Sequence, residues 1–264
     1  AVLLEPLTDA ETDELIERLL GAAELELELR EQIRHAAGGN PLFVEQMLAM
    51  VQESAEAVTV PPTIQALLAA RLDQLPSGGR AALERGAVEG QVFHRGAVQA
   101  LTSDRSAVPT QLMGLVRKEL VRPTPTAIPD DDAFRFRHLL VRDAAYDSLP
   151  KATRAELHER FAAWIEEHGG DLVELDEILG YHLEQATRCR AELGETRDDL
   201  AERAAARLTA AGTRAFRRTD YAAGRKLLGR AVDLLPDDAP ARFDALVSLG
   251  ICAYVGGDLE DADS

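Results

Sequence analysis

Cysteine, aromatic residues and long apolar runs are all scarce in this 264-residue sequence, and each scarcity argues against one class of protein. The two cysteines, Cys189 and Cys252, lie far apart with no metal-ligand spacing, which argues against a disulfide framework and is typical of a reducing cytosol. Aromatic residues make up 5% of the chain, and its richness in Ala, Leu, Glu and Arg favours helices over sheets. No apolar run approaches the roughly 20 residues that cross a bilayer, so we expect a cytoplasmic protein that does not contact membranes.

Basic residues and catalytic motifs are scarce as well. Lys and Arg number 29 against 46 Asp and Glu, which gives a net charge of −17, and no domain-sized segment carries the basic footprint of a nucleic-acid-binding domain. The sequence has no phosphate-binding G-x-x-x-x-G-K-S/T motif, no H-E-x-x-H spacing, and no Ser or Cys beside an evident base. We therefore expect no catalytic activity and no metal site from this chain by itself. Hydrophobic residues, at 46%, are sufficient for a folded core.

The stretch Gly38-Gly39-Asn40-Pro41 predicts a sharp corner between two helices. Glycine adopts the left-handed conformation that ends a helix without a steric penalty. Asn40 is then a good N-cap, and Pro41 suits the first helical position, where no amide donor is needed. Upstream, Thr8 followed three residues later by Glu11 has the spacing of a capping box and predicts a helix start.

Hydrophobic periodicity predicts a mainly α protein with three parts. Residues 7–75 carry helical apolar spacing interrupted by tight turns, which indicates a small helical bundle. Residues 76–150 predict three helices and then two short strands near 120–123 and 134–137, the order of a winged-helix domain with a short β-ribbon. Residues 151–264 predict only helices. The expected helices after the bundle lie near 78–89, 94–101, 106–118, 151–168, 174–189, 197–218, 220–234 and 240–256, with a last one from 258.

The final part contains an internal repeat. The matching pairs, all at one offset, are Gly212 with Gly250, Asp220 with Asp258, and Gly224 with Ala262. Small, apolar and proline residues in this part also follow the pattern of a tetratricopeptide-type helix pair, whose period is about 34 residues. Stacked helix pairs that bury their faces against their neighbours are therefore expected, as an α–α superhelical array.

Five sequence strings, in this order, resemble the C-terminal part of the signal-transduction ATPases with numerous domains (STAND). The strings are GNPLFVE (39–45), VPPTIQALLAARLD (60–73), FRFRH (134–138), VRDAAY (141–146) and GYHLEQA (180–186). The resemblance is closest to bacterial proteins of the MalT type and to those that join an ATPase module to tetratricopeptide repeats, often behind a nucleotide cyclase domain. It spans nearly the whole chain.

The resemblance implies a nucleotide-sensing role. Gly39 and Pro41 would line the adenine of a bound nucleotide, and His138 would reach the β-phosphate of ADP, although Leu139 follows where the receptors have aspartate. The nucleotide-binding domain itself would lie outside this sequence, with residues 1–6 as the exit from it, because the sequence starts without Met and stops inside a helical pattern. ATP or ADP would thus bind only in the full-length parent, and the repeats would bind a protein partner or an inducer.

Two alternatives remain open. The chain is a nucleotide-independent helical interaction scaffold if the corner and His138 have only structural roles. It is a winged-helix DNA-binding regulator if residues 108–118 read bases through Thr110, Gln111, Arg117 and Lys118. DNA is the less favoured partner, since Leu112 and Leu115 fit a helix that packs against a core.

Overall fold

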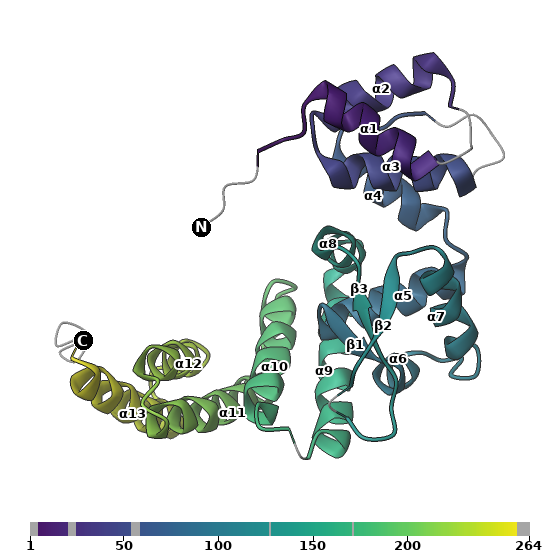
Figure 1. The fold of residues 1–264 in the computed structure, drawn as a ribbon. Coiled ribbons are helices and arrows are strands. Elements are labelled where there is room, and N and C mark those ends of the chain that lie inside the picture. Colours follow the sequence, from purple (N-terminus) through teal and green to yellow (C-terminus); the bar gives the residue numbers. More distant parts are fainter. Residues whose placement is uncertain (1–4, 21–24, 54–58, 127, 171, 258–264) are drawn as a thin grey trace.

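A computed structural model describes residues 5–20, 25–53, 59–126, 128–170 and 172–257. Within these ranges the chain forms thirteen α-helices and one three-stranded antiparallel sheet, so the predicted mainly α class is confirmed. Figure 1 shows the helices α1 to α4 grouped together, a mixed unit around the sheet, and a row of long helices. None of the described helices is long and apolar enough to cross a membrane.

The first four helices form a small bundle. They are α1 (Asp9–Leu20), α2 (Leu27–Ala37), α3 (Pro41–Glu53) and α4 (Ile64–Asp73). Helix α1 starts at the predicted capping box: Glu11 Oε2 accepts from the backbone N–H of Thr8 at 2.9 Å, and Thr8 Oγ1 accepts from the backbone N–H of Glu11 at 3.3 Å. Helix α3 is central, because Phe43, Val44 and Met47 are buried in the core of the bundle.

The middle part has the topology of a winged helix. Its elements in chain order are α5 (Ser77–Glu89), β1 (Val92–His94), α6 (Arg95–Leu101), α7 (Val108–Arg117), β2 (Val121–Thr124) and β3 (Ala133–Phe136). Strand β3 pairs with both other strands, with Val92 opposite Arg135 and Val121 opposite Phe136. The two predicted strands are confirmed as β2 and β3, which pair as a ribbon, whereas the third strand, β1, was not predicted. Strand β1 is only three residues long, so the alternation of buried Phe93 with half-buried Val92 and His94 is too short to predict a strand.

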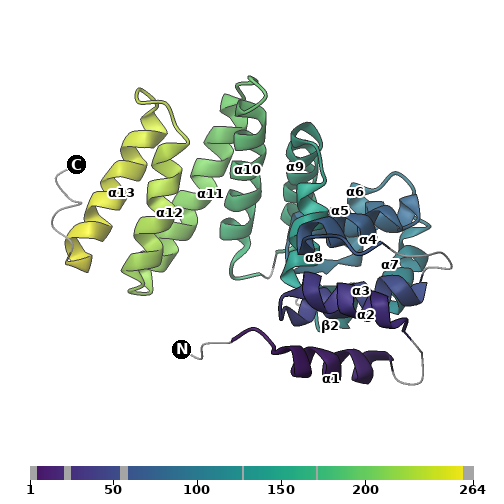
Figure 2. The ribbon, with the colours of Figure 1, turned by 90° about the horizontal axis from the view of Figure 1, so that it is seen from above.

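From α8 onward the chain is helical. The helices are α8 (Leu139–Asp147), α9 (Lys151–His168), α10 (Leu175–Ala191), α11 (Asp198–Arg217), α12 (Tyr221–Asp233) and α13 (Pro240–Gly256). Helices α9 to α13 lie side by side in sequence order in both views (Figures 1 and 2). This arrangement is the α–α array that the sequence predicts. The helix expected from residue 258 lies outside the described residues.

Two glycines of the repeat pattern permit close helix packing. A Cβ atom added at Gly212 of α11 would lie 2.8 Å from Leu228 Cγ, and one added at Gly224 of α12 would lie 2.9 Å from Cys252 Sγ. Both glycines therefore let neighbouring helices of the array approach more closely than a larger residue would allow. The repeat partners Asp258 and Ala262 lie outside the described residues.

The parts share their cores across the predicted boundaries. Helix α4 places Leu67 in the core of the bundle, while Leu68 and Leu72 belong to the core of the winged-helix part. At the other end, Phe161 and Ile165 of α9 pack in one core with Leu101 of α6. Helix α4 has apolar side chains in two cores, so the bundle cannot rotate on the winged-helix part without disturbing close packing in one of them.

Candidate functional site

The predicted corner has the expected geometry. Gly38 ends α2 in the left-handed conformation with a φ of 52°, and Gly39 follows with a φ of 76°. Asn40 Oδ1 accepts from the backbone N–H of Leu42 at 3.0 Å, and Pro41 is the first residue of α3. The structural part of the prediction is confirmed: both glycines supply a positive φ, and Asn40 caps the next helix.

Gly39 permits a close backbone contact, and its neighbour is the chain's own N-terminal segment. The backbone N–H of Leu7 donates to the carbonyl of Gly39 at 2.9 Å. A Cβ atom at Gly39 would lie 2.4 Å from Leu7 O and 2.8 Å from Pro6 Cβ, and Gly39 is buried. Pro41, in contrast, is exposed. Of the two residues predicted to line adenine, Pro41 is therefore the accessible one, and the adenine contact stays a prediction.

Replacing Gly39 by alanine should destabilise the chain by about 2 kcal/mol, because the alanine must hold a positive φ and its Cβ would displace residues 6–7. Gly38→Ala is the matched control. It also holds a positive φ, but its Cβ would meet nothing within 4 Å, so the expected loss is about 1 kcal/mol. Urea unfolding followed by circular dichroism measures both. Equal losses in the two variants would contradict the contact with Pro6 and Leu7.

His138 lies between β3 and α8 and contacts the bundle. Its Nε2 is 3.2 Å from Oε2 of Glu45, and both side chains are about one-third exposed, at 32% and 38%. Glu45 is four residues after Pro41 on α3, so the two side chains share one face of that helix, one turn apart. The structure thus brings His138 and Pro41 to the same side of α3 through Glu45, with Gly39 just before the helix starts.

A hollow of about 210 Å³ adjoins this contact. Its lining includes two guanidinium groups and an imidazole, from Arg71, Arg137 and His138. It also includes two carboxylates, from Glu45 and Glu119. Charged groups from the bundle, from the turn before β2 and from the end of β3 therefore face one small space. Such a lining suits a polar or charged group better than an apolar one.

Arg71 of α4 joins the bundle to the winged-helix part from inside. Its side chain is 4% exposed and donates to Glu53 Oε1 at 3.0 Å, to the carbonyl of Lys118 at 3.3 Å, and to Gln46 Oε1. Lys118, at the end of α7, also pairs with Glu53 through its ammonium group. Burial lowers the pKa of the Arg71 guanidinium, while the Glu53 carboxylate opposes that shift. The guanidinium stays charged, and its three acceptors come from both parts.

The sequence reasoning missed Glu45, Glu53 and Arg71. Arg71 lies within the string of residues 60–73, but a lone arginine in an amphipathic helix gives no sign that it is buried. For Glu45 the sequence offered its spacing from Pro41: residues four apart share a helix face, so Glu45 could have been predicted to lie near the Pro41 site.

The side chains suggested for DNA reading are not all available. Gln111 is turned inward, with its Oε1 buried and without a partner among the described residues. Lys118 is engaged by Glu53, which leaves Thr110 and Arg117 exposed on α7. The described residues also contain no group of three His, Cys, Asp or Glu side chains placed to hold a metal ion.

Comparison with known proteins finds similarity but no established activity. Residues 8–61 match a protein family described as a domain of unknown function, DUF8739. A protein of Rhizobium meliloti (strain 1021), described as uncharacterized, is 26% identical over 211 residues, which are 75% of this chain and 19% of that protein. The chain therefore spans about a fifth of the length of this relative. Neither description names a ligand, a reaction or a partner.

Proposed function

We propose that this chain is the regulatory part of a STAND-type ATP-binding signalling protein. It couples the nucleotide state of a P-loop domain elsewhere in the parent protein to the helical array, which binds a protein partner or an inducer. The observation that carries the proposal is the contact between His138 Nε2 and Glu45 Oε2, 3.2 Å long and one helical turn from the exposed Pro41. The contact supports the proposal because an imidazole, a group able to bind phosphate, lies beside the face of α3 that carries the Pro41 ring.

The carboxylate of Glu45 lies beside His138 Nε2, where the phosphate of a bound nucleotide would otherwise lie. A carboxylate and a phosphate offer the same acceptor oxygens, and a protonated imidazole binds either. The β-phosphate of ADP would therefore compete with Glu45 for His138. Binding of the nucleotide would release α3 from the junction of β3 and α8, while the buried Arg71 holds the bundle on the winged-helix part. The bundle would thus change its contact with His138 without separating from the rest of the chain.

Substitutions in the full-length parent test this competition. His138→Ala and Pro41→Ala should each weaken binding of a fluorescent ADP analogue by about tenfold, the effect of one lost charge-assisted hydrogen bond or ring contact. Glu45→Gln should strengthen binding, because His138 then loses its competing carboxylate. Glu119→Gln is the matched control, since Glu119 lines the same hollow but pairs with Arg137 at 3.4 Å. Unchanged affinity in all of the first three variants would contradict the proposed site.

That outcome would favour the second candidate function, a helical interaction scaffold that does not respond to nucleotide. The observation behind it is the outer face of α13. Phe243 and Tyr254 are each 67% exposed and Ile251 is 50% exposed, although large apolar side chains on a helix normally face a partner.

A further inference from the structure

A cavity of about 560 Å³ lies where the winged-helix part meets the helical array. Strand β1 and the loop between β2 and β3 form one wall, and α9, α10 and α12 form the others. Its floor is apolar, with Phe161 and Ile165 of α9 and Ile178 of α10. The volume falls within the range of small-molecule sites, about 300–1,000 Å³, and such sites combine an apolar lining with a few polar groups.

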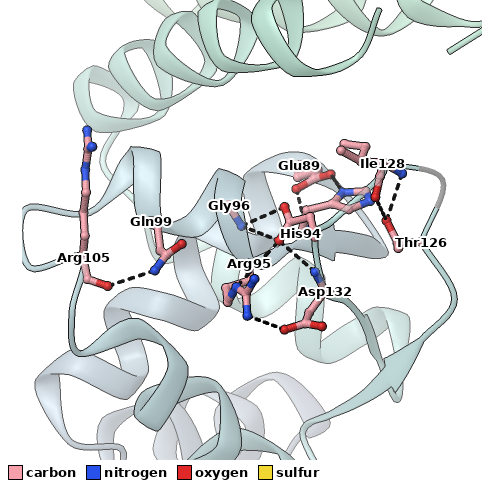
Figure 3. Close-up of polar contacts among 10 residues, drawn as sticks. Glu89, His94, Arg95, Gly96, Gln99, Arg105, Thr126, Ile128 and Asp132 are labelled. Carbon is pink, nitrogen blue, oxygen red and sulfur yellow. Dashed lines mark hydrogen bonds and ion pairs between the residues drawn. The ribbon is translucent and has the colours of Figure 1, made fainter. Parts of the chain in front are cut away.

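The loop wall is held in place by hydrogen bonds. The backbone N–H of Gly96 donates to Asp131 Oδ2 at 2.9 Å, and Arg95 pairs with Asp132 (Figure 3). Thr126 Oγ1 accepts from the backbone N–H of Ile128 at 2.9 Å, which fixes the residue that lines the cavity. The cavity is therefore shaped before any ligand enters.

His94 offers the first polar group. Its Nδ1 is 2.5 Å from Glu89 Oε1, and its backbone N–H donates to Glu89 Oε2 at 2.9 Å. Its Nε2 is buried and has no partner among the described residues (Figure 3 shows the ring between Glu89 and Ile128). Burial raises the pKa of Glu89, and although burial opposes it, the hydrogen bond and charge of Glu89 raise the pKa of His94.

Those shifts determine where the protons are. A buried His–Glu pair is more stable as a net neutral unit than as a net anion, since burial disfavours an unbalanced charge. In the neutral unit one proton lies between His94 Nδ1 and Glu89, and the other is on His94 Nε2. That N–H is therefore a buried donor without an acceptor, which costs free energy unless an acceptor is supplied.

His182 offers the second polar group, through a buried chain of hydrogen bonds. Tyr146 Oη is 2.9 Å from His158 Nε2, and His158 Nδ1 is 2.8 Å from His182 Nδ1. Burial lowers the pKa of His158 to about 3, and it places the pKa of His182 well below its usual value, so both rings are neutral. Burial also raises the pKa of Tyr146 to about 12, which keeps its hydroxyl protonated.

The tautomers of this chain follow from the donors. A phenol hydroxyl donates to an imidazole nitrogen more strongly than it accepts from an imidazole N–H, so we assign Tyr146 as the donor to His158 Nε2. His158 then carries its proton on Nδ1 and donates to His182 Nδ1, which leaves the proton of His182 on Nε2. The structure gives this Nε2–H no acceptor among the described residues, and His182 lines the same cavity as His94.

We propose that this cavity binds a small uncharged molecule with an apolar body and an acceptor oxygen, such as a carbonyl, for the N–H groups of His94 and His182. An uncharged ligand is favoured because the two N–H donors disfavour a cation and the acidic rim disfavours an anion. Arg230 donates to Glu184 through its Nε at 3.0 Å, whereas Glu174 and Glu177 are exposed at the rim and would repel an anion. This site is independent of the nucleotide role, because it lies away from His138 and Pro41.

Three small probes with one ring and different head groups test the proposal on the intact chain. Phenylacetamide is uncharged with a carbonyl acceptor, phenylacetate is an anion, and phenethylamine is a cation. Nitrogen-detected NMR of the imidazoles and calorimetry should show phenylacetamide binding with a Kd of about 1 mM, as expected for a ligand of this size, and both other probes binding more weakly.

Variants locate the binding. His94→Phe should weaken phenylacetamide by about fivefold, the loss of one hydrogen bond, and Ile178→Trp, which fills the cavity, should abolish binding. His35→Phe, an exposed histidine on α2, is the matched control and should leave binding unchanged. If His94→Phe does not fold, Ile178→Trp still decides. The proposal is overturned if no probe binds saturably, if phenylacetate or phenethylamine binds more tightly, or if Ile178→Trp binds like the wild type.

Discussion

Acidification from about pH 7 to about pH 5 should lower the free energy of unfolding by at least 2 kcal/mol through two buried histidines. Burial, together with the charges of Arg142 and Arg154, lowers the pKa of His158 from 6.5 to about 3 in the folded protein. At about pH 5 the unfolded chain binds a proton that the folded chain does not, which costs about 2 kcal/mol for His158 alone. His182, whose pKa is also lowered, changes stability in the same direction.

The sign follows from the folded-state pKa values. A histidine with a lowered folded pKa contributes stability above its unfolded pKa, and this contribution is lost as the pH falls toward the folded value. The pKa of His94 is raised instead, so its contribution is present at low pH and is lost as the pH rises. Glu89, whose pKa is also raised, acts in the same direction as His94, so the loss through His158 and His182 is measured by comparing the wild type with a variant that lacks both rings.

A double variant isolates the histidine pair. His158→Phe with His182→Leu should flatten the dependence of the urea midpoint on pH between about pH 7 and about pH 5, whatever its effect on stability at neutral pH. His35→Phe removes an exposed histidine and should keep the wild-type slope. A double variant with the wild-type slope would show that the buried pair does not control the acid sensitivity.

Arg71→Met should destabilise the chain by about 3 kcal/mol and uncouple the bundle from the winged-helix part. Methionine retains much of the apolar stem but leaves Gln46 Oε1 and the carbonyl of Lys118 without the guanidinium. Removing one partner from a buried charged network costs more than the pair contributes, because the remaining polar groups stay desolvated.

Two probes separate the loss of stability from the loss of coupling. Trp164 is the only tryptophan and lies in α9, so its fluorescence reports the array, whereas circular dichroism reports all helices. In Arg71→Met, the dichroism signal should begin to fall at lower urea than the fluorescence, since the bundle unfolds first. Arg80→Met is the control, because Arg80 is 34% exposed and its ion pairs with Asp73 and Glu84 are worth less than about 1 kcal/mol. Coincident transitions in Arg71→Met would contradict the role of Arg71 as the link.

Local signals in the sequence predicted most of the helices and the corner. Capping and turn residues such as Thr8, Gly38 and Asn40 act within a few positions of their own place in the chain, so their effect can be read without the fold.

The candidate sites depend on contacts between distant residues, which a single sequence does not reveal. His138 and Glu45, or His158 and His182, become neighbours only after β3 and the helices have packed. Their residue types were visible, and His138 was singled out by resemblance. Which partner each would meet, and whether Arg71 would be buried, depended on the packing of helices far apart in the sequence.

The hydrogen bond from Leu7 to Gly39 makes the corner a mechanical anchor. A pulling force on the chain ahead of Glu5 reaches this bond and the Pro6 contact before it reaches α1, because the segment is fastened to the start of α3. Tension would therefore act on the helix that carries Pro41 and Glu45, and it would bypass the capping box at Thr8. In this way a load on the N-terminal segment is delivered to α3, whose Glu45 contacts His138.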